Sequence, residues 1–216
     1  MIKAVLFDLD GTLIDSAEVI LKCFSSVFDE IFPNVQVSEE ERLEFLGPTL
    51  VHTFGRYTKD SKLVEKAIKS YVHCSIEEHD NDNIKAFPNA VELLKTLKLL
   101  DIKVGVVTSK QSSAAAYGLK INGLLDFVDI LVGSDNVENH KPDPEALLKA
   151  LKMLEVNNKE VLYVGDHEND ILAARNANVL SVGVSYSYRL KHIKQLNPDY
   201  IISDLLEIIN IVKSIN

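Results

Sequence analysis

Short runs of β-branched and aliphatic residues recur along the chain and are typical of buried parallel strands. They occupy residues 2–7, 103–107, 128–132, 161–164 and 180–184. Apolar residues with helical spacing predict amphipathic helices over 90–100, 145–154 and 170–177, with a last, largely apolar helix over 205–212. Because strands and helices alternate, we expect an α/β fold built on a doubly wound parallel sheet.

Residues 15–83 break this alternation, since they contain no convincing strand and several helix starts. Asp15 with Glu18, and Ser38 with Glu41, have the spacing of a capping box, which predicts two helix N-termini. The polar segment Asp80-Asn81-Asp82-Asn83 is turn-prone and would form a hinge before the α/β pattern resumes. We therefore expect a helical domain (15–83) inserted into an α/β domain (1–14 and 84–216).

Composition indicates a globular protein that carries an acidic net charge. Apolar residues make up 46% of the 216 positions, and the net charge is −9. This charge disfavours nucleic-acid binding and would repel an anionic substrate. A phosphate site would therefore have to supply its own cations, helix N-termini or metal ion.

The cysteines and the N-terminus suggest a cytoplasmic protein. Cys23 and Cys74 are far apart and match no metal-binding spacing, so we expect ordinary apolar residues rather than a disulfide or a zinc site. The apolar stretch at residues 1–7 is too short for a signal peptide or a membrane span. No membrane partner is expected. The sequence does not determine the oligomeric state, and a monomer is compatible with it.

Ligands of open α/β sheets bind at the carboxyl ends of the strands, where this chain carries polar motifs. The first strand ends in Asp8-Leu9-Asp10-Gly11-Thr12, in which two carboxylates flank one residue before a sharp turn at the glycine. The two carboxylates would repel one another unless a bound cation reduced the repulsion or the two groups had different roles. The simpler alternative is a turn that contains an N-cap aspartate.

The second and third motifs contain candidate phosphate ligands. Thr108-Ser109-Lys110 ends the second strand and offers hydroxyl and backbone N–H donors, although these residues could simply cap the next helix. In the segment 140–145, we expect Asp143 as a helix N-cap and Pro144 as the first helical residue. Lys141 has no such structural explanation, and its ammonium suits a phosphate or a carboxylate cluster.

The fourth motif, Gly165-Asp166-His167-Glu168-Asn169-Asp170, is acidic and follows another apolar run. Acids in a first helical turn are common, which explains Glu168 and Asp170 without function. Asp166 precedes the helix, and metal coordination explains it better. Hard oxygen ligands of this type suit Mg²⁺.

These four motifs, in this order, resemble those of the haloacid dehalogenase superfamily of phosphatases over essentially the whole chain. The helical insertion is similar to the cap domain of that superfamily. Within it, residues 45–50 and 140–144 look like the phosphoglycolate phosphatase branch and its inorganic-pyrophosphatase relatives. The resemblance implies a Rossmann-like core and a Mg²⁺-dependent phosphatase that acts through an aspartyl-phosphate. Its partner would be a small phosphorylated metabolite or pyrophosphate.

The resemblance also implies roles for individual residues. Asp8 would be the nucleophile and a metal ligand, and Asp10 the general acid and base, with its backbone carbonyl on the metal. Thr108 and Lys141 would hold the phosphoryl group. Asp166 would bind Mg²⁺, and Asp170 would lie at the metal or one shell out. The other substrate-binding candidates are Leu9, Ser109, Gly47, Thr49, His52 and Arg56.

Other functions remain compatible with the sequence. A phosphosugar mutase or a hydrolytic dehalogenase of the same superfamily would use a similar core. A phosphorylatable receiver domain also places acids, Thr and Lys on a parallel sheet, but the DxD motif and the helical insertion argue against it. A noncatalytic scaffold would have no need of the four motifs. The natural substrate cannot be read from the sequence.

Overall fold

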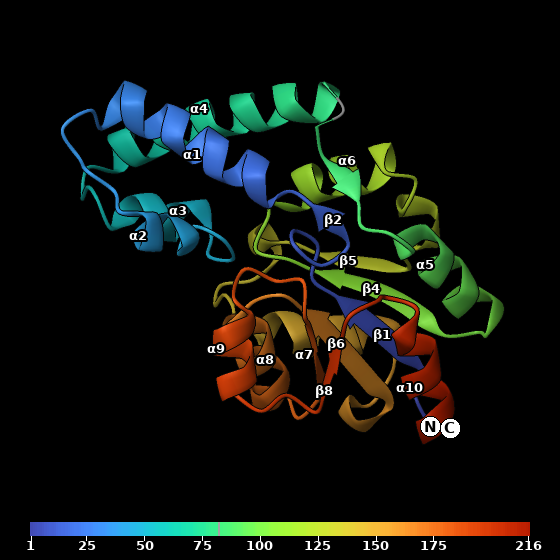
Figure 1. Ribbon diagram of the computed structural model, residues 1–216. Coiled ribbons are helices and arrows are strands. Elements are labelled where there is room, and N and C mark those ends of the chain that lie inside the picture. Colours follow the sequence, from blue (N-terminus) through green and yellow to red (C-terminus); the bar gives the residue numbers. More distant parts are fainter. Residues whose placement is uncertain (82) are drawn as a thin grey trace. The chain divides into compact units, whose positions relative to one another are not determined.

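The chain divides into two compact units in the computed structural model, which describes residues 1–81 and 83–216. One unit comprises Met1–Ile14 and Ala86–Asn216, and the other comprises Asp15–Lys85. The first is an α/β unit and the second is helical (Figure 1). Asp82, within the predicted hinge, lies outside the described residues.

A six-stranded sheet with the order β5-β4-β1-β6-β7-β8 forms the centre of the α/β unit. Every strand pair in it is parallel. From β1 the chain builds the sheet toward one edge and then toward the other, which confirms the predicted doubly wound α/β fold. The strands are β1 (Ala4–Phe7), β4 (Lys103–Val107), β5 (Ile130–Val132), β6 (Val161–Gly165), β7 (Leu180–Val184) and β8 (Tyr200–Ile202).

Strand β1 lies between β4 and β6, so the carboxyl ends of these three strands are neighbours. Phe7, the last residue of β1, is in register with Val106 of β4 and Val164 of β6. The residues that follow each strand therefore emerge at one edge of the sheet. Two further short strands, β2 (Ile14–Asp15) and β3 (Lys85–Ala86), form a separate two-stranded sheet.

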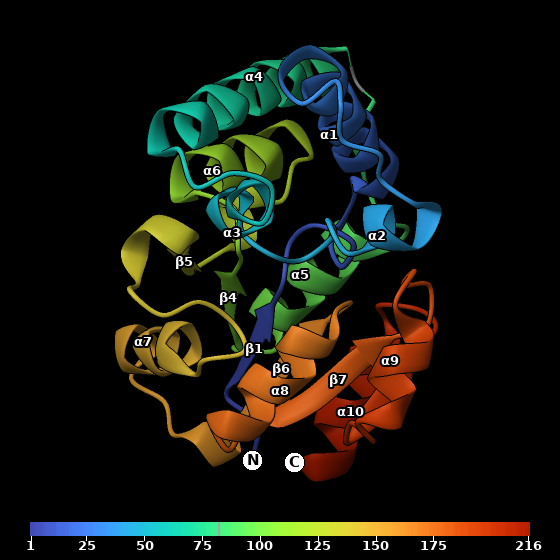
Figure 2. The same cartoon turned by 90° about the vertical axis from the view of Figure 1, so that its left-hand side faces the viewer.

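Helices cover both faces of the six-stranded sheet (Figure 1). Helices α7 and α8, which face the viewer in Figure 2, share a core cluster with alternate residues of β1 and β6, such as Leu6 and Tyr163. Helices α5 and α10 pack together on the other side. The helices of this unit are α5 (Ala90–Leu99), α6 (Ser112–Ile121), α7 (Glu145–Leu154), α8 (Glu168–Asn176), α9 (Leu190–Gln195) and α10 (Glu207–Ile215).

All five strands expected from the sequence are present, with shifts of at most two residues at their ends, whereas β8, α6 and α9 were not predicted. β8 contains three residues, too few for a periodic signal. α6 buries the small residues Ala115 and Gly118 with Leu119, so its apolar stripe is faint. Three short 3-10 helices, η1 (Leu125–Phe127), η2 (Ser134–Asn136) and η3 (Asn158–Glu160), complete the unit.

The helical unit has an aromatic core. The ring of Phe24 lies 4.6 Å from that of Phe45, 4.8 Å from Tyr71 and 5.2 Å from Phe54, measured between centroids. These side chains are buried, and aromatic rings contribute large apolar surfaces to a small core. The helices are α1 (Ala17–Ile31), α2 (Glu39–Leu43), α3 (Leu50–Gly55) and α4 (Ser61–Asp80).

A disulfide joins Cys23 of α1 to Cys74 of α4, so the expectation that both cysteines are ordinary apolar residues is wrong. Their Cα atoms lie 5.7 Å apart although 51 positions separate them in sequence. The reason is that α1 and α4 pack against each other, which sequence spacing alone does not reveal.

The helix starts agree only in part with the expected caps. Ser38 caps α2 by accepting a hydrogen bond from Glu41 N–H, but Asp15 lies in β2, and Ser16 precedes α1 instead. Pro144 occupies the N-cap position of α7 that we expected for Asp143, whose side chain still accepts a hydrogen bond from Glu145 N–H at 2.9 Å. None of the helices in the described parts of the chain is long and apolar enough to span a bilayer.

Candidate active site

Asp8 is held at the centre of the sheet by the strand that precedes it. Its backbone N–H donates to Val164 O of β6 at 2.8 Å, and 6% of the residue's surface is exposed. The next side chain, Leu9, is fully buried, so only the backbone of this predicted substrate-binding residue can contact a ligand. The carbonyl of Leu9 accepts hydrogen bonds from Leu13 and Ile14 N–H, which closes a tight turn around Asp10.

Gly11 lets this turn approach the end of β6. Its φ of 80° lies in the left-handed region that favours glycine. A Cβ atom at Gly11 would overlap the carboxylate of Asp166. The glycine of the first motif therefore makes room for the aspartate of the fourth motif.

Asp8, Asp166 and Asp170 form a carboxylate cluster. Each offers an oxygen atom, and these three oxygens lie within 4.8 Å of one another. Asp8 follows β1, Asp166 follows β6, and Asp170 is in the first turn of α8. The first and fourth motifs, 158 positions apart from Asp8 to Asp166, thus meet because β1 and β6 are adjacent.

The cluster carries an excess of negative charge in a buried setting. Burial, with Asp170 nearby, raises the pKa of Asp8 to about 7, although the Lys141 ammonium opposes the rise. Burial together with the charges of Asp8 and Asp170 raises the pKa of Asp166 well above its usual range. Both carboxyl groups would therefore be stabilised in their charged form by an additional cation.

Lys141 is the cation that the structure places in this cluster. Its Nζ donates to Asp8 Oδ1 at 2.7 Å, to Asp170 Oδ1 at 2.6 Å and to Tyr163 Oη at 3.0 Å. Its side chain is 6% exposed. Burial alone would lower the pKa of Lys141, but Asp170 and Asp8 outweigh it and the pKa is raised. Lys141 is thus held charged between two aspartates.

Tyr163 is a site residue that the sequence did not reveal. It belongs to the apolar run of β6, and nothing in that run distinguishes its hydroxyl from a core side chain. The hydroxyl accepts from Lys141 and lies 3.0 Å from both Val107 O and Asp170 Oδ1, and it can donate its one proton to either of them. Tyr163 therefore orients Lys141 and Asp170 together.

Asp170 and His167 have structural partners. Asp170 Oδ2 accepts from His167 N–H at 3.0 Å, and Asp170 Oδ1 is occupied by Lys141 and Tyr163. His167 is the N-cap of α8, and its Nδ1 accepts from Asn169 N–H at 3.0 Å. Burial lowers the pKa of His167. These contacts explain His167, for which the sequence suggested no role, as a helix cap.

Asp10 forms an ion pair with Lys110, a residue whose charge the sequence analysis did not assign to the site. Lys110 Nζ lies 3.0 and 3.3 Å from the two carboxylate oxygens of Asp10, and both side chains are partly buried. Thr108 is 5% exposed, and its Oγ1 accepts from Lys110 N–H at 3.2 Å. Ser109 is half-buried between them. The second motif thus lies beside the first, as the adjacency of β1 and β4 requires.

The remaining candidates belong to the helical unit. Gly47 has a φ of 99°, and Thr49 is the N-cap of α3, its Oγ1 accepting from His52 N–H at 3.3 Å. His52 is exposed. Arg56 forms ion pairs with Glu41 and Glu44 at 3.7 and 3.0 Å. These contacts account for Thr49 and Arg56 structurally and leave their contact with a substrate as a prediction.

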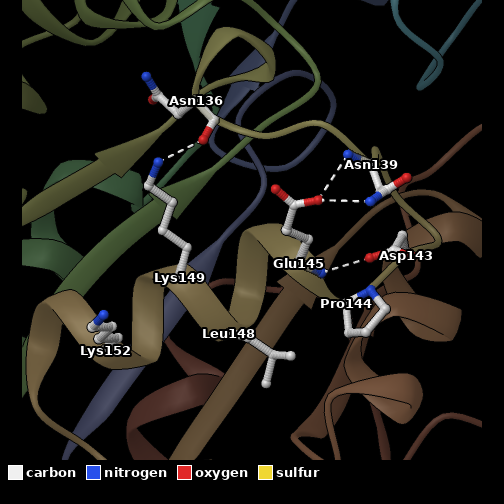
Figure 3. A pocket seen from close by; sticks show the side chains of 8 residues that line it. All are labelled: Asn136, Asn139, Asp143, Pro144, Glu145, Leu148, Lys149 and Lys152. Carbon is white, nitrogen blue, oxygen red and sulfur yellow. Dashed lines mark hydrogen bonds between the residues drawn. The ribbon is translucent and has the colours of Figure 1, made fainter.

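A groove of about 500 Å³ lies at the start of α7 and contains none of the clustered aspartates (Figure 3). Glu145 in its wall is occupied by hydrogen bonds from Asn139, and Lys149 donates to Asn136 O. The charged side chains of Asp143, Glu145 and Lys149 are thus already hydrogen-bonded to amide and backbone groups of the same groove. It is lined by Asn136, Asn139, Asp143, Pro144, Glu145, Leu148, Lys149 and Lys152.

The carboxylate cluster can bind a metal ion. It offers only hard oxygen ligands, which Mg²⁺ prefers. Within residues 1–81 and 83–216, no donor hydrogen-bonds to the carboxylate of Asp166, although this group is partly buried among the other acids. A carboxylate that receives no hydrogen bond, in a cluster with excess negative charge, fits a divalent cation.

Comparisons with known proteins agree with this geometry. Residues 5–184 match the family of haloacid dehalogenase-like hydrolases. The chain is 41% identical to PpaX of Clostridium perfringens over 217 residues that cover both chains completely. It is 35% identical to the pyrophosphatase PpaX of Bacillus cereus, over all of this chain and 98% of the relative.

A solved structure supports the same relationship. A haloacid dehalogenase-like hydrolase from Bacteroides fragilis superimposes with a TM-score of 0.86 and 31% identity, over 96% of this chain and all of that one. The family match excludes the receiver-domain alternative, because it extends over both the DxD motif and the helical insertion. On the strength of its sequence, its fold and its clustered aspartates, this chain belongs to the haloacid dehalogenase-like hydrolases and is a phosphatase of that family.

Proposed function

We propose that this phosphatase hydrolyses pyrophosphate or a small phosphomonoester through an aspartyl-phosphate on Asp8, with Mg²⁺ as its cofactor. The observation that carries the proposal is the position of Asp8, which lies buried between the Lys141 ammonium and the other aspartates of the cluster. A carboxylate fixed in this way has one oxygen paired with a cation and the other available for attack.

The proposed reaction has two steps. In the first, a carboxylate oxygen of Asp8 attacks phosphorus, the bond to the leaving oxygen breaks, and Asp10 gives that oxygen a proton. In the second, Asp10 takes a proton from water, the water oxygen attacks the phosphorus, and the bond to Asp8 breaks. Inorganic phosphate leaves, and both aspartates return to their initial state.

Asp8, Asp166 and the backbone carbonyl of Asp10 would hold the metal ion. When bound, Mg²⁺ would offset the repulsion between the carboxylates and an anionic substrate. Asp170 is expected to act chiefly by holding Lys141, since its oxygens are already occupied by Lys141, Tyr163 and His167 N–H.

Lys141 and Thr108 are proposed to hold the oxygens of the transferring phosphoryl group. Lys141 is already paired with the nucleophile, so a phosphoryl group at Asp8 would come within reach of its ammonium. Thr108 ends β4, the strand beside β1. The backbone N–H groups after Asp8, including that of Leu9, and Ser109 would add donors.

Pyrophosphate is favoured as the substrate because relatives that cover the full chain are named pyrophosphatases. A phosphomonoester such as phosphoglycolate is the second candidate, and a phosphosugar mutase is the alternative within the superfamily. The helical unit would act as a cap that selects the substrate through Gly47, Thr49, His52 and Arg56. Turnover of pyrophosphate and phosphoesters in the presence of Mg²⁺, ranked by kcat/KM, separates these possibilities, since a mutase would return an isomer instead of free phosphate.

The covalent step is tested by trapping. Beryllium fluoride with Mg²⁺ should form an adduct on Asp8 that ¹⁹F NMR detects, and Asp8→Asn should abolish the adduct and lower turnover on the order of 10⁴-fold or more. Circular dichroism checks that the variant remains folded. A wild-type protein that turns over substrate but forms no adduct would rule out the aspartyl-phosphate.

A further inference from the structure

Lys110 is a second cation at the carboxyl edge of the sheet, and the mechanism above assigns it no task. Its ammonium contacts both carboxylate oxygens of Asp10, at 3.0 and 3.3 Å. Exposed lysines commonly reach into solvent, but this side chain is only 15% exposed. Its position therefore calls for an explanation beyond solubility.

The backbone around Lys110 is fixed, so the side chain starts from a defined point. Its N–H donates to Thr108 Oγ1 at 3.2 Å, and its carbonyl accepts from Ser134 N–H at 2.9 Å. From this anchored loop after β4, the side chain extends to Asp10 in the turn after β1. Because both loops belong to the α/β unit, the ion pair between Lys110 and Asp10 is part of the structure of this unit.

Lys110 and Lys141 differ in the hydrogen-bond acceptors around their ammonium groups. The three protons of Lys141 have Asp8, Asp170 and Tyr163 as acceptors. The ammonium of Lys110 has only the two oxygens of Asp10 among the described groups. At least one proton of Lys110 is thus available to an anion that approaches Asp10.

The place of this anion follows from the role of Asp10. A carboxyl group that protonates the leaving oxygen must contact that oxygen, so a cation beside Asp10 also lies beside the leaving group. A neutral alcohol offers this cation no charge. A phosphate or carboxylate leaving group does, and in a chain of net charge −9 such a group needs a local cation.

We propose that Lys110 is a specificity residue that binds the leaving group when this group is an anion, such as the second phosphate of pyrophosphate. The inference rests on the proposed function, because it assumes that Asp10 faces the leaving oxygen. Lys110 would hydrogen-bond to an anionic oxygen of the leaving group while remaining beside Asp10. It would therefore favour diphosphates and acid-bearing phosphoesters over esters of neutral alcohols.

Three substrates separate this role from an effect exerted through Asp10. In pyrophosphate the part that leaves carries negative charge while it is still bonded in the substrate. In p-nitrophenyl phosphate it is an uncharged aryl group whose leaving oxygen has similar basicity. In phenyl phosphate it is an uncharged aryl group whose leaving oxygen is more basic. Lys110→Met keeps the length of the side chain and removes its charge. We expect kcat/KM for pyrophosphate to fall about 10- to 100-fold, with less than about a threefold change for both aryl phosphates.

Lys110→Arg should restore much of the activity toward pyrophosphate, because it returns the charge. Lys120→Met, an exposed position on α6, is the matched control and should change none of the three values. The largest loss on phenyl phosphate would show instead that Lys110 acts through Asp10, and equal losses on all three would indicate a structural role. Either result overturns the proposal. A wild-type protein that hydrolyses none of the three would reject the proposed function itself, so the two failures are distinguishable.

Discussion

Lys141 is the residue on which the candidate site depends most directly. It is buried between Asp8 and Asp170, and removal of one member of a buried charge pair leaves an uncompensated charge. Its hydroxyl partner Tyr163 has no charge of its own. Substitution of Lys141 would therefore test the contribution of charge to the site, and substitution of Tyr163 the contribution of side-chain orientation.

Tyr163→Phe should lower the free energy of unfolding by about 1–3 kcal/mol, since Val107 O loses its 3.0 Å hydrogen bond and keeps only the longer one from Lys141 Nζ at 3.5 Å, and Lys141 loses an acceptor. Urea titration followed by circular dichroism measures this change. Tyr188→Phe, at a residue that is 56% exposed, is the control and should have little effect. Equal stabilities of the two variants would contradict the network.

Asp10→Asn should cost roughly 10²- to 10⁴-fold in turnover for substrates with poor leaving groups, because the variant cannot protonate the leaving oxygen. Activated aryl phosphates need less protonation and should lose less. Steady-state rates for a series of aryl phosphates, plotted against leaving-group basicity, measure the difference. A plot parallel to that of the wild type would argue against a general acid at this position.

Metal binding should weaken as the pH falls below about 7. Burial raises the pKa of Asp8 to about 7, so in the metal-free protein this carboxyl group is increasingly protonated below that pH. The pKa of Asp166 is raised as well, and a cation must displace protons from both groups. The affinity for Mg²⁺ therefore falls as the pH falls.

Calorimetric titration with Mg²⁺ in two buffers of different ionisation enthalpy counts the protons released. We expect more protons to be released at pH 6 than at pH 8. Asp166→Ala should weaken Mg²⁺ binding and activity together. Proton release that does not depend on pH would show that these carboxyl groups are not the ligands.

At the scale of the elements, the glycines and the disulfide bring distant segments together. Gly11 leaves room for the Asp166 carboxylate beside the turn after β1. Gly165 likewise leaves room for the side chain of Asp170, which a Cβ atom at this position would overlap. In the helical unit, the link between Cys23 and Cys74 ties α1 to α4. This link closes a long loop, and so restricts the unfolded chain more than the folded one.

Reduction of the disulfide should therefore destabilise the helical unit by about 4 kcal/mol, the value expected for a loop with a sequence separation of 51. Scanning calorimetry with and without a thiol reductant measures the shift in unfolding temperature. The double variant Cys23→Ala and Cys74→Ala serves as the control, because a reductant should not affect it. An equal response of both proteins would show that the two thiols are not joined in solution.

At the scale of the whole molecule, the two units divide the work in the proposed function. The α/β unit contains the clustered aspartates, Lys110 and Lys141. The helical unit contains a separate aromatic core and can keep its fold while its surface residues change. Substitutions in it should therefore affect substrate choice more than chemistry.

Thr49→Ala and Arg56→Ala should lower kcat/KM for the preferred substrate about 10-fold and reorder the ranking of substrates, while turnover of p-nitrophenyl phosphate changes little. Arg56 also forms exposed ion pairs, so Lys69→Ala, which removes a comparable pair with Glu65, is the control for that loss. Equal losses on every substrate would place these residues in catalysis or folding. An unchanged ranking would show that neither residue selects the substrate.

The sequence by itself determined the fold class and the ends of the central strands. Apolar runs of strand length, alternating with amphipathic stretches, specify buried parallel strands and covering helices because both patterns follow local periodicity. The positions of Asp8 and Asp166 after such runs placed both at one sheet edge, whereas Lys141 lies in the longer loop between β5 and α7. Local signals were weaker for β8, whose three residues show no period, and for α6, which buries small side chains.

Only the tertiary structure decided which side chains meet. Tyr163 is indistinguishable from a core residue until β6 is placed beside β1 and Lys141 reaches its hydroxyl. The pair of Lys110 with Asp10 joins loops 100 positions apart, and the disulfide joins helices whose packing no spacing reveals. Contacts of this kind depend on strand order and helix packing, which arise from the whole chain, whereas periodicity and motifs report only on near neighbours in sequence.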